Sequence, residues 1–83
     1  MKKITIYTTT VCPYCVRAKA LLKRKDLEFV EVDVSDEEAR LQMMSKTAGR
    51  RSVPQIFIGD HHVGGCDDLY ALEKDNELDK LVK

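Results

Sequence analysis

Short apolar stretches alternate between strand-like and helix-like spacing along the first half of the chain. Ile4 and Ile6 are separated by threonine, which predicts a strand at about residues 2–8. Cys12-Pro13 marks the turn into a helix, and apolar residues at helical spacing continue that helix to about residue 25. The β-rich run at residues 29–34 predicts a second strand, which can lie parallel to the first because a helix separates the two. The first part of the chain is therefore predicted to be a βαβ unit.

A second helix is predicted at residues 36–48. Ser35 and Glu38 have the spacing of a capping box, in which two side chains satisfy backbone N–H groups at the helix start. Acidic residues in the first turn are favoured by the helix dipole. Gly49 is expected to close the helix. Three apolar residues are expected to share one face, namely Leu41, Met44 and Ala48.

The C-terminal part of the chain combines a hairpin with further helices. Two short strands, at residues 55–58 and 61–63, are separated by the turn candidate Gly59-Asp60. Gly64-Gly65 ends the hairpin, and the residues from Cys66 onward predict a third helix. A short terminal helix is predicted from Leu78, Leu81 and Val82. The order βαβαββα(α) predicts an α/β fold, with a small mixed sheet flanked by helices.

Length and charge restrict the possible functions. The 83 residues are expected to form one domain, residues 1–83, with one modest core. Lys plus Arg and Asp plus Glu both number 14, so no basic field points to nucleic acid. No run of about 18 apolar residues is present, and the N-terminal residues become polar too soon for a signal peptide. We expect a soluble protein with a local binding site, acting on neither nucleic acid nor membrane.

Cys12-Pro13-Tyr14-Cys15 is the strongest chemical signal in the chain. The motif follows a predicted strand and opens a helix, where unpaired N–H groups and the helix dipole favour a thiolate. The spacing places both sulfur atoms on the same side of the first turn, so a reversible disulfide can form. We therefore expect Cys12 to be the nucleophile. Cys15, one turn into the helix, is expected to be the more buried, resolving thiol.

Other interpretations of the cysteine pair are weaker. A zinc site needs about four ligands, and the remaining candidates, Cys66, His61 and His62, are distant in sequence and lack paired spacing. A structural disulfide across so short a loop would constrain the unfolded chain very little, and a reducing compartment would reduce it. Redox catalysis without a metal is the favoured interpretation.

Val53-Pro54 and Gly64-Gly65-Cys66-Asp67-Asp68 form a second group of candidate residues. If the bond before Pro54 is cis, the Val53 backbone could pair with an extended, peptide-like ligand. The glycines precede a helix start, where free N–H groups could hold a carboxylate and Asp67 could receive an ammonium group. An ordinary strand start, a tight turn and a packing role for Cys66 are the simpler alternatives. No role is assigned to the solvent-facing residues His61, His62, Arg50 and Arg51.

The chain resembles the bacterial dithiol glutaredoxins through motifs spread over nearly its whole length. These are Tyr7-Thr8, Cys12-Pro13-Tyr14-Cys15, Arg17-Ala18-Lys19, Ser52-Val53-Pro54-Gln55-Ile56-Phe57 and Gly64-Gly65-Cys66-Asp67-Asp68-Leu69-Tyr70. Cys-X-X-Cys alone is shared with thioredoxins and metal sites, but its combination with the other motifs in this order is specific. The resemblance implies a thioredoxin fold with a four-stranded mixed sheet and a cis bond before Pro54.

The resemblance also implies a glutathione groove between the start of the Cys12 helix, the Val53-Pro54 segment and the Gly65-Cys66-Asp67 turn. The Val53 backbone would pair with the cysteine of glutathione, and Cys66 and Asp67 would hold its γ-glutamyl end. Tyr14 and Ser52 would line the groove. The chain departs from the family at Thr9, where a lysine is common. The contributions of that lysine to the thiolate and to the glycine carboxylate of glutathione are therefore not expected from Thr9.

The implied activity is glutathione-dependent thiol–disulfide oxidoreduction by Cys12 and Cys15, acting on protein disulfides and glutathione mixed disulfides. We expect glutathione as the reducing cosubstrate, no tightly bound cofactor, and a monomer in the cytoplasm whose partners are disulfide-containing or glutathionylated proteins. Three alternatives stay open. The chain could be reduced by a flavin-dependent reductase, could carry an iron–sulfur cluster on Cys12 and external glutathione, or could be a domain without redox activity. The Ser-Val-Pro and Gly-Gly-Cys-Asp motifs argue against the first alternative, and Pro13 argues against the second.

Overall fold

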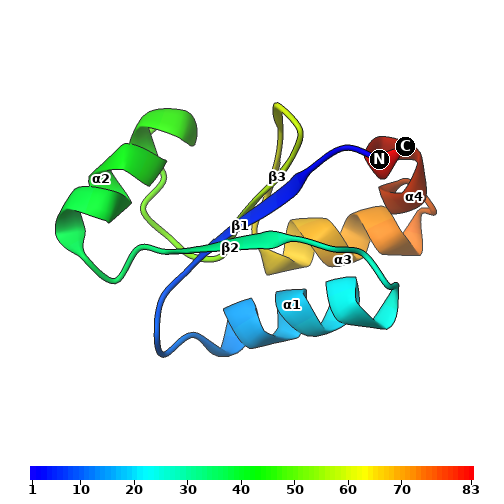
Figure 1. Ribbon diagram of the computed structural model, residues 1–83, viewed down its shortest axis with the longest axis horizontal. Coiled ribbons are helices and arrows are strands. Elements are labelled where there is room, and N and C mark those ends of the chain that lie inside the picture. The colour runs from blue at the N-terminus through cyan, green and yellow to red at the C-terminus, as the bar shows by residue number, and fades with distance from the viewer.

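Strands and helices follow one another in the order that the sequence predicts. The computed structural model describes residues 1–83 (Figure 1). None of its helices is long and apolar enough to cross a membrane. The elements are β1 (Ile4–Thr8), α1 (Pro13–Arg24), β2 (Val30–Asp33), α2 (Glu37–Lys46), β3 (Gln55–Ile58), β4 (His61–Gly64), α3 (Cys66–Lys74) and α4 (Leu78–Val82).

The four strands form one mixed sheet in the order β2-β1-β3-β4. β1 and β2 are parallel, with α1 as their crossover connection, whereas β3 is antiparallel to both β1 and β4. Gly59 adopts a positive φ of 58° in the turn between β3 and β4, a conformation that glycine adopts without steric cost. Because β1 occupies an inner position, the chain that leaves its C-terminal end starts near the middle of the sheet.

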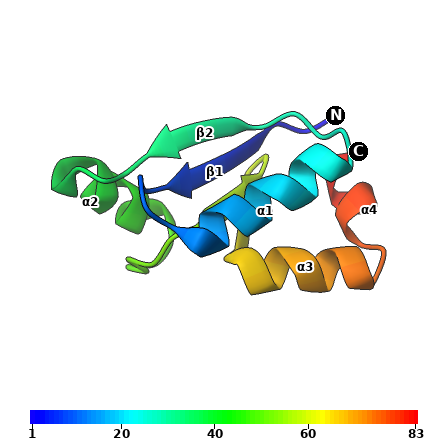
Figure 2. The ribbon, with the colours of Figure 1, turned by 90° about the horizontal axis from the view of Figure 1, so that it is seen from below.

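Two helices cover one face of the sheet. α1 and α3 lie side by side on that face, and α2 lies apart from them beyond the ends of β1 and β2 (Figures 1 and 2). Apolar side chains alternate along β1 and recur at helical spacing along α1, which buries one face of each element. The buried cluster consists of Ile4, Ile6, Ala18, Leu21, Leu22, Leu27, Ile56, Ile58, Cys66, Leu69, Leu78 and Val82.

The start of α2 differs from the predicted capping box. Asp36, not Ser35, is the N-cap residue, and its carboxylate accepts a hydrogen bond from the Ala39 N–H at 3.2 Å. Ser35 instead contacts the segment before Cys12, because its hydroxyl accepts from the Thr10 N–H at 3.2 Å. The prediction that Ser35 and Glu38 form the cap was therefore wrong. The Ser35 hydroxyl bonds to Thr10, which lies 25 positions earlier in the chain, and not to the helix start.

The buried face of α2 also differs from the prediction. Met43 is the buried residue of the helix and Thr47, its C-cap, is buried too, whereas Leu41 and Ala48 are exposed. The helix ends at Lys46, two residues before the predicted end. Ala48 and Gly49 have positive φ values of 56° and 85°, so the chain turns away as Gly49 predicts.

Candidate functional site

Cys12 and Cys15 form a disulfide at the start of α1, with their Cα atoms 5.2 Å apart. Cys12 is the N-cap residue, and its Sγ accepts a hydrogen bond from the Cys15 N–H at 3.1 Å. Pro13 occupies the first helical turn, where the missing N–H would have had no acceptor in the helix. A sulfur atom at Cys12 is therefore held against a helix N-terminus, where negative charge is favoured.

The two cysteines differ in their access to solvent. Cys15 is 1% exposed, whereas Cys12 is only partly buried. The Cys12 Sγ lies 3.9 Å from the carbonyl oxygen of Val53, on a segment 41 positions further along the chain. Cys12 is therefore more accessible than Cys15 to a disulfide from solvent, and Val53 lies beside its sulfur.

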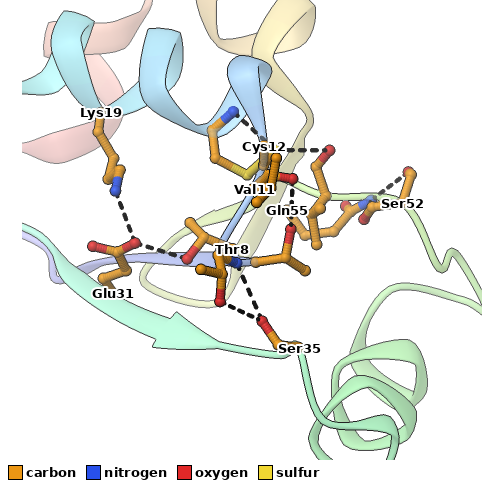
Figure 3. The surroundings of a disulfide bond; sticks show 12 residues. Thr8, Val11, Cys12, Lys19, Glu31, Ser35, Ser52 and Gln55 are labelled. Carbon is orange, nitrogen blue, oxygen red and sulfur yellow. Dashed lines mark hydrogen bonds and ion pairs between the residues drawn. A yellow bond between two sulfur atoms is a disulfide. The ribbon is translucent and has the colours of Figure 1, made fainter.

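Hydrogen bonds hold the segment that carries Cys12 (Figure 3). The hydroxyl of Thr8, at the end of β1, donates to Glu31 on β2 at 2.7 Å, and Glu31 forms an ion pair with Lys19 of α1 at 2.9 Å. Lys19 and Thr8 together lower the pKa of the Glu31 carboxyl. The Thr9 hydroxyl donates to the Val11 carbonyl at 3.4 Å within the same segment. Thr9, three positions before Cys12, thus places a neutral side chain with a local partner where the resemblance implies a lysine.

A cleft beside Cys12 brings together all the predicted glutathione-binding residues. Its walls come from the first turn of α1, the segment before β3 and the start of α3, and the Val53–Pro54 bond in the middle segment is cis, as the resemblance implies. A Cβ atom built on Gly65 would lie 3.6 Å from the Pro54 carbonyl oxygen, so these two walls approach closely. The lining residues are Tyr14, Arg50, Ser52, Val53, Pro54, Gly65, Cys66, Asp67 and Asp68.

Several backbone groups of the cleft take part in no backbone–backbone hydrogen bond. Neither the N–H nor the carbonyl of Val53 takes part in a backbone hydrogen bond. The N–H groups of Cys66 and Asp67 open α3 and are likewise free, while the Gly65 N–H donates to the Asp68 carboxylate at 2.9 Å. The cleft therefore offers a strand-like edge on one side and a helix N-terminus on the other.

Two residues of the cleft were missed from the sequence. Arg50 was interpreted as part of a solvated loop, and Asp68, although it belongs to the candidate glycine motif, was given no role of its own, yet both line the cleft. The spacing of Asp68 from the N-cap Gly65 was a signal that the sequence did carry, because a carboxylate at the third helical position can accept from the N-cap N–H. Arg50 had no comparable local signal.

His62 is also not where the sequence placed it. His61 is exposed as expected, but His62 is half-buried and shares a hydrogen bond of 2.7 Å with the Gln55 side chain. Burial, with a smaller effect of Arg50, lowers the pKa of His62. The expectation of a solvent-facing histidine was wrong at this position because residue 62 lies on the β4 side that packs against Phe57.

Cys66 is a free thiol, 4% exposed, at the first position of α3. Burial raises the pKa of its thiol, an effect that Arg17 partly offsets. We expect iodoacetamide at pH 7 to modify Cys12 of the reduced protein at least about tenfold faster than Cys66, since the thiolate is the reacting species. Mass spectrometry of the native protein should therefore show one added group, on Cys12. Urea-unfolded protein, in which all three cysteines react, is the control, and equal native labelling of Cys66 would contradict the expectation.

No cluster of three or more His, Cys, Asp or Glu side chains has the arrangement of a metal site.

The sheet order, the placement of the helices and the cysteine pair at the start of α1 together define a thiol–disulfide oxidoreductase of thioredoxin fold.

Comparisons with known proteins agree with this class. The family model of glutaredoxins matches residues 4–63. Glutaredoxin 3 of Escherichia coli K12 is 51% identical over 83 residues, which cover 100% of both chains. The solution structure of glutaredoxin from Brucella melitensis has a TM-score of 0.88 and 57% identity, covering 100% of this chain and 90% of that one. The crystal structure of a buckwheat glutaredoxin–glutathione complex has a TM-score of 0.86 and 25% identity, covering 98% and 76%.

The chain therefore belongs to the glutaredoxin family, and it is a glutathione-dependent thiol–disulfide oxidoreductase with Cys12 and Cys15 as its redox pair.

Proposed function

We propose that Cys12 alone reduces glutathione mixed disulfides and that Cys12 and Cys15 together reduce protein disulfides, with glutathione bound in the cleft beside Cys12. The observation that carries this proposal is the position of the partly buried Cys12, whose Sγ lies 3.9 Å from the Val53 carbonyl oxygen at the wall of a cleft with N–H groups that make no backbone hydrogen bond. A peptide-like thiol bound there would present its sulfur to Cys12.

In the one-cysteine route, the Cys12 thiolate attacks the glutathione sulfur of a mixed disulfide. A bond forms between Cys12 and glutathione, and the substrate leaves as a thiolate that takes a proton from solvent. A second glutathione thiolate then attacks the bound glutathione sulfur. This step releases oxidised glutathione and restores the Cys12 thiolate, which the Cys15 N–H and the helix N-terminus stabilise.

In the two-cysteine route, Cys12 attacks one sulfur of a protein disulfide, and the other substrate sulfur leaves as a thiolate. The Cys15 thiolate then attacks Cys12 Sγ, which releases the second substrate thiolate and forms the Cys12–Cys15 disulfide. Two glutathiones reduce this disulfide and leave as oxidised glutathione. The 5.2 Å separation of the Cα atoms suits the closing step.

Each end of glutathione has a complementary group in the cleft. The Val53 N–H and carbonyl can pair with its backbone as an added strand. The γ-glutamyl carboxylate can accept from the N–H groups of Cys66 and Asp67, while the Asp67 carboxylate receives the ammonium group. Arg50 supplies a cation for the glycine carboxylate, in place of the lysine that Thr9 replaces. The remaining contacts would come from Tyr14, Ser52, Pro54 and Gly65.

We also propose that the protein works as a monomer in the cytoplasm. A reducing compartment with a glutathione pool keeps Cys66 free and returns the cysteine pair to its dithiol form. Of the six large apolar residues that are exposed, Val11, Tyr14 and Val16 flank Cys12, and Met1, Val30 and Leu41 lie in other segments. So few residues fall short of the broad apolar surface that an obligate dimer buries. Light scattering should therefore give the mass of one chain, 9.5 kDa.

Asp67→Ala tests the proposed glutathione site. Loss of a charged hydrogen-bond partner is expected to raise the KM for a small glutathione mixed disulfide about tenfold, with kcat nearly unchanged. The assay couples turnover to glutathione and glutathione reductase. Asp75→Ala, which removes an exposed carboxylate from the other end of α3, is the control and should behave as wild type.

Two outcomes of this assay would contradict the proposal. A wild-type KM in Asp67→Ala would mean that glutathione binds elsewhere. A wild type that is inactive with glutathione but is reduced by a thioredoxin reductase would mean that a flavin-dependent reductase is the electron donor.

A further inference from the structure

The side chain of Gln55 joins Ser52, in one wall of the cleft, to His62 on β4. Gln55 is the first residue of β3 and is 0% exposed. Its amide nitrogen donates to the Ser52 carbonyl at 2.9 Å and lies 3.2 Å from the Ser52 hydroxyl. Its amide oxygen lies 2.7 Å from Nε2 of His62 on β4. Both the nitrogen and the oxygen of this fully buried amide therefore have a partner, Ser52 and His62 respectively.

These contacts determine how the histidine is protonated. The Gln55 nitrogen faces an acceptor, the Ser52 carbonyl, so the amide oxygen must be the group that faces His62. Nε2 of His62 must then carry a hydrogen and donate it. Both the neutral and the charged ring can do so, and burial keeps the ring neutral at pH 7 by lowering its pKa, with Arg50 and His61 acting in the same direction and Asp68 opposing them.

Aromatic packing fixes the orientation of the His62 ring. The ring stacks on Phe57 with centroids 4.7 Å apart and an angle of 20° between the planes. Tyr7 meets Phe57 edge to face at 5.8 Å. The stacking restricts the His62 ring to one orientation. In this orientation its Nε2–H points at the Gln55 amide oxygen.

We propose that His62 and Gln55 are positioning residues for glutathione. Through Ser52 they hold the Val53 backbone groups at the distance from the α3 start that glutathione requires. The hydrogen bonds join Ser52, which lines the cleft, to His62 on β4, and β4 runs directly into Gly65 and the start of α3, which form the facing wall. This inference rests on the proposed function, because it assigns a source of affinity to the same site.

His62→Phe separates hydrogen bonding from packing. Phenylalanine can keep the stack on Phe57 but cannot donate to Gln55. We expect the KM for the glutathione mixed disulfide to rise about three- to tenfold, as befits a lost hydrogen bond that leaves a buried oxygen unpaired. The kcat and the rate at which dithiothreitol reduces the Cys12–Cys15 disulfide should stay near wild type. His61→Phe, the same substitution at the exposed neighbour, is the matched control and should change neither quantity.

Gln55→Met is the second variant, and it removes the amide while nearly keeping the side-chain volume. It should raise the KM for the glutathione mixed disulfide by a similar factor. If His62→Phe unfolds at the assay temperature, Gln55→Met alone tests the positioning role. Folded variants with wild-type KM, or a lower kcat at wild-type KM, would overturn the inference. Asp67→Ala distinguishes this failure from that of the proposed function. A raised KM in Asp67→Ala beside wild-type values here rejects only the positioning role, whereas wild-type values throughout reject the cleft as the glutathione site.

Discussion

Cys12→Ser is expected to lower disulfide reduction at least about a thousandfold, because no other sulfur in the fold can take its place as the nucleophile. Cys15 is buried behind it, and Cys66 lies within the core cluster. Cys15→Ser should keep the reduction of a small glutathione mixed disulfide, which needs one thiol. It should lose the reduction of a protein disulfide, because no second thiol resolves the intermediate.

Both assays use the same coupled system with glutathione and glutathione reductase, so the two variants can be compared directly. Cys66→Ser is the matched control, and it should keep both activities, since the buried thiol takes no part in either route. Loss of both activities in Cys15→Ser would contradict the one-cysteine route. Retention of either activity in Cys12→Ser would contradict the assignment of the nucleophile.

Leu69→Ala is expected to lower the free energy of unfolding by about 2–5 kcal/mol, the usual effect of opening a cavity in a packed core. Leu69 is 0% exposed and lies in α3, directly after Asp68, which lines the cleft. In a chain of this size the loss corresponds to a fall in Tm of roughly 8–40 °C. Thermal unfolding followed by circular dichroism measures it.

Leu41→Ala is the matched control for this experiment. The substitution is again leucine to alanine, but Leu41 lies on α2 and is 54% exposed. The Tm of the Leu41→Ala protein should therefore shift by only a few degrees. Equal shifts in the two variants would mean that α3 does not pack against the core as described.

The order of elements could be predicted because each depends on signals within a few residues. Ile4 and Ile6 alternate with threonine, Cys12-Pro13 opens a helix, and Gly59-Asp60 connects two β-rich runs. The type and position of each of these elements can therefore be predicted from its own residues. The four-stranded sheet itself followed from the resemblance and not from these patterns, since strand order depends on pairings such as Ile4 with Ile58.

The buried face and the N-cap residue of α2 could not be predicted either, because both depend on contacts with distant parts of the chain. Its short apolar pattern fits more than one stripe, and packing selects Met43 in place of Leu41 and Met44. Ser35 and Asp36 are both good N-cap residues, and the choice depends on the hydrogen bond that Ser35 accepts from Thr10. Neither the packing of Met43 nor the hydrogen bond of Ser35 is indicated by the residues next to it in the sequence.

The candidate site shows a similar division. The cysteine pair and the glycine turn were recognisable because their residue types are tied to local backbone chemistry. Arg50 and His62 are ordinary surface residue types in sequence, and only the approach of the β3 segment to α3 and the stacking on Phe57 give them defined places. Their inclusion depends on tertiary packing rather than on local propensity.

The inner position of β1 has a consequence for the protein while it is being made. One edge of β1 pairs with β2 and the other pairs with β3, which lies in the second half of the chain. A nascent chain that has emerged only as far as α2 can complete the first pairing but not the second. Until β3 leaves the ribosome, β1 is an edge strand with unpaired N–H and carbonyl groups, which other chains can join. The strand that leads to Cys12 therefore has an open edge in the nascent chain that β3 covers in the folded protein.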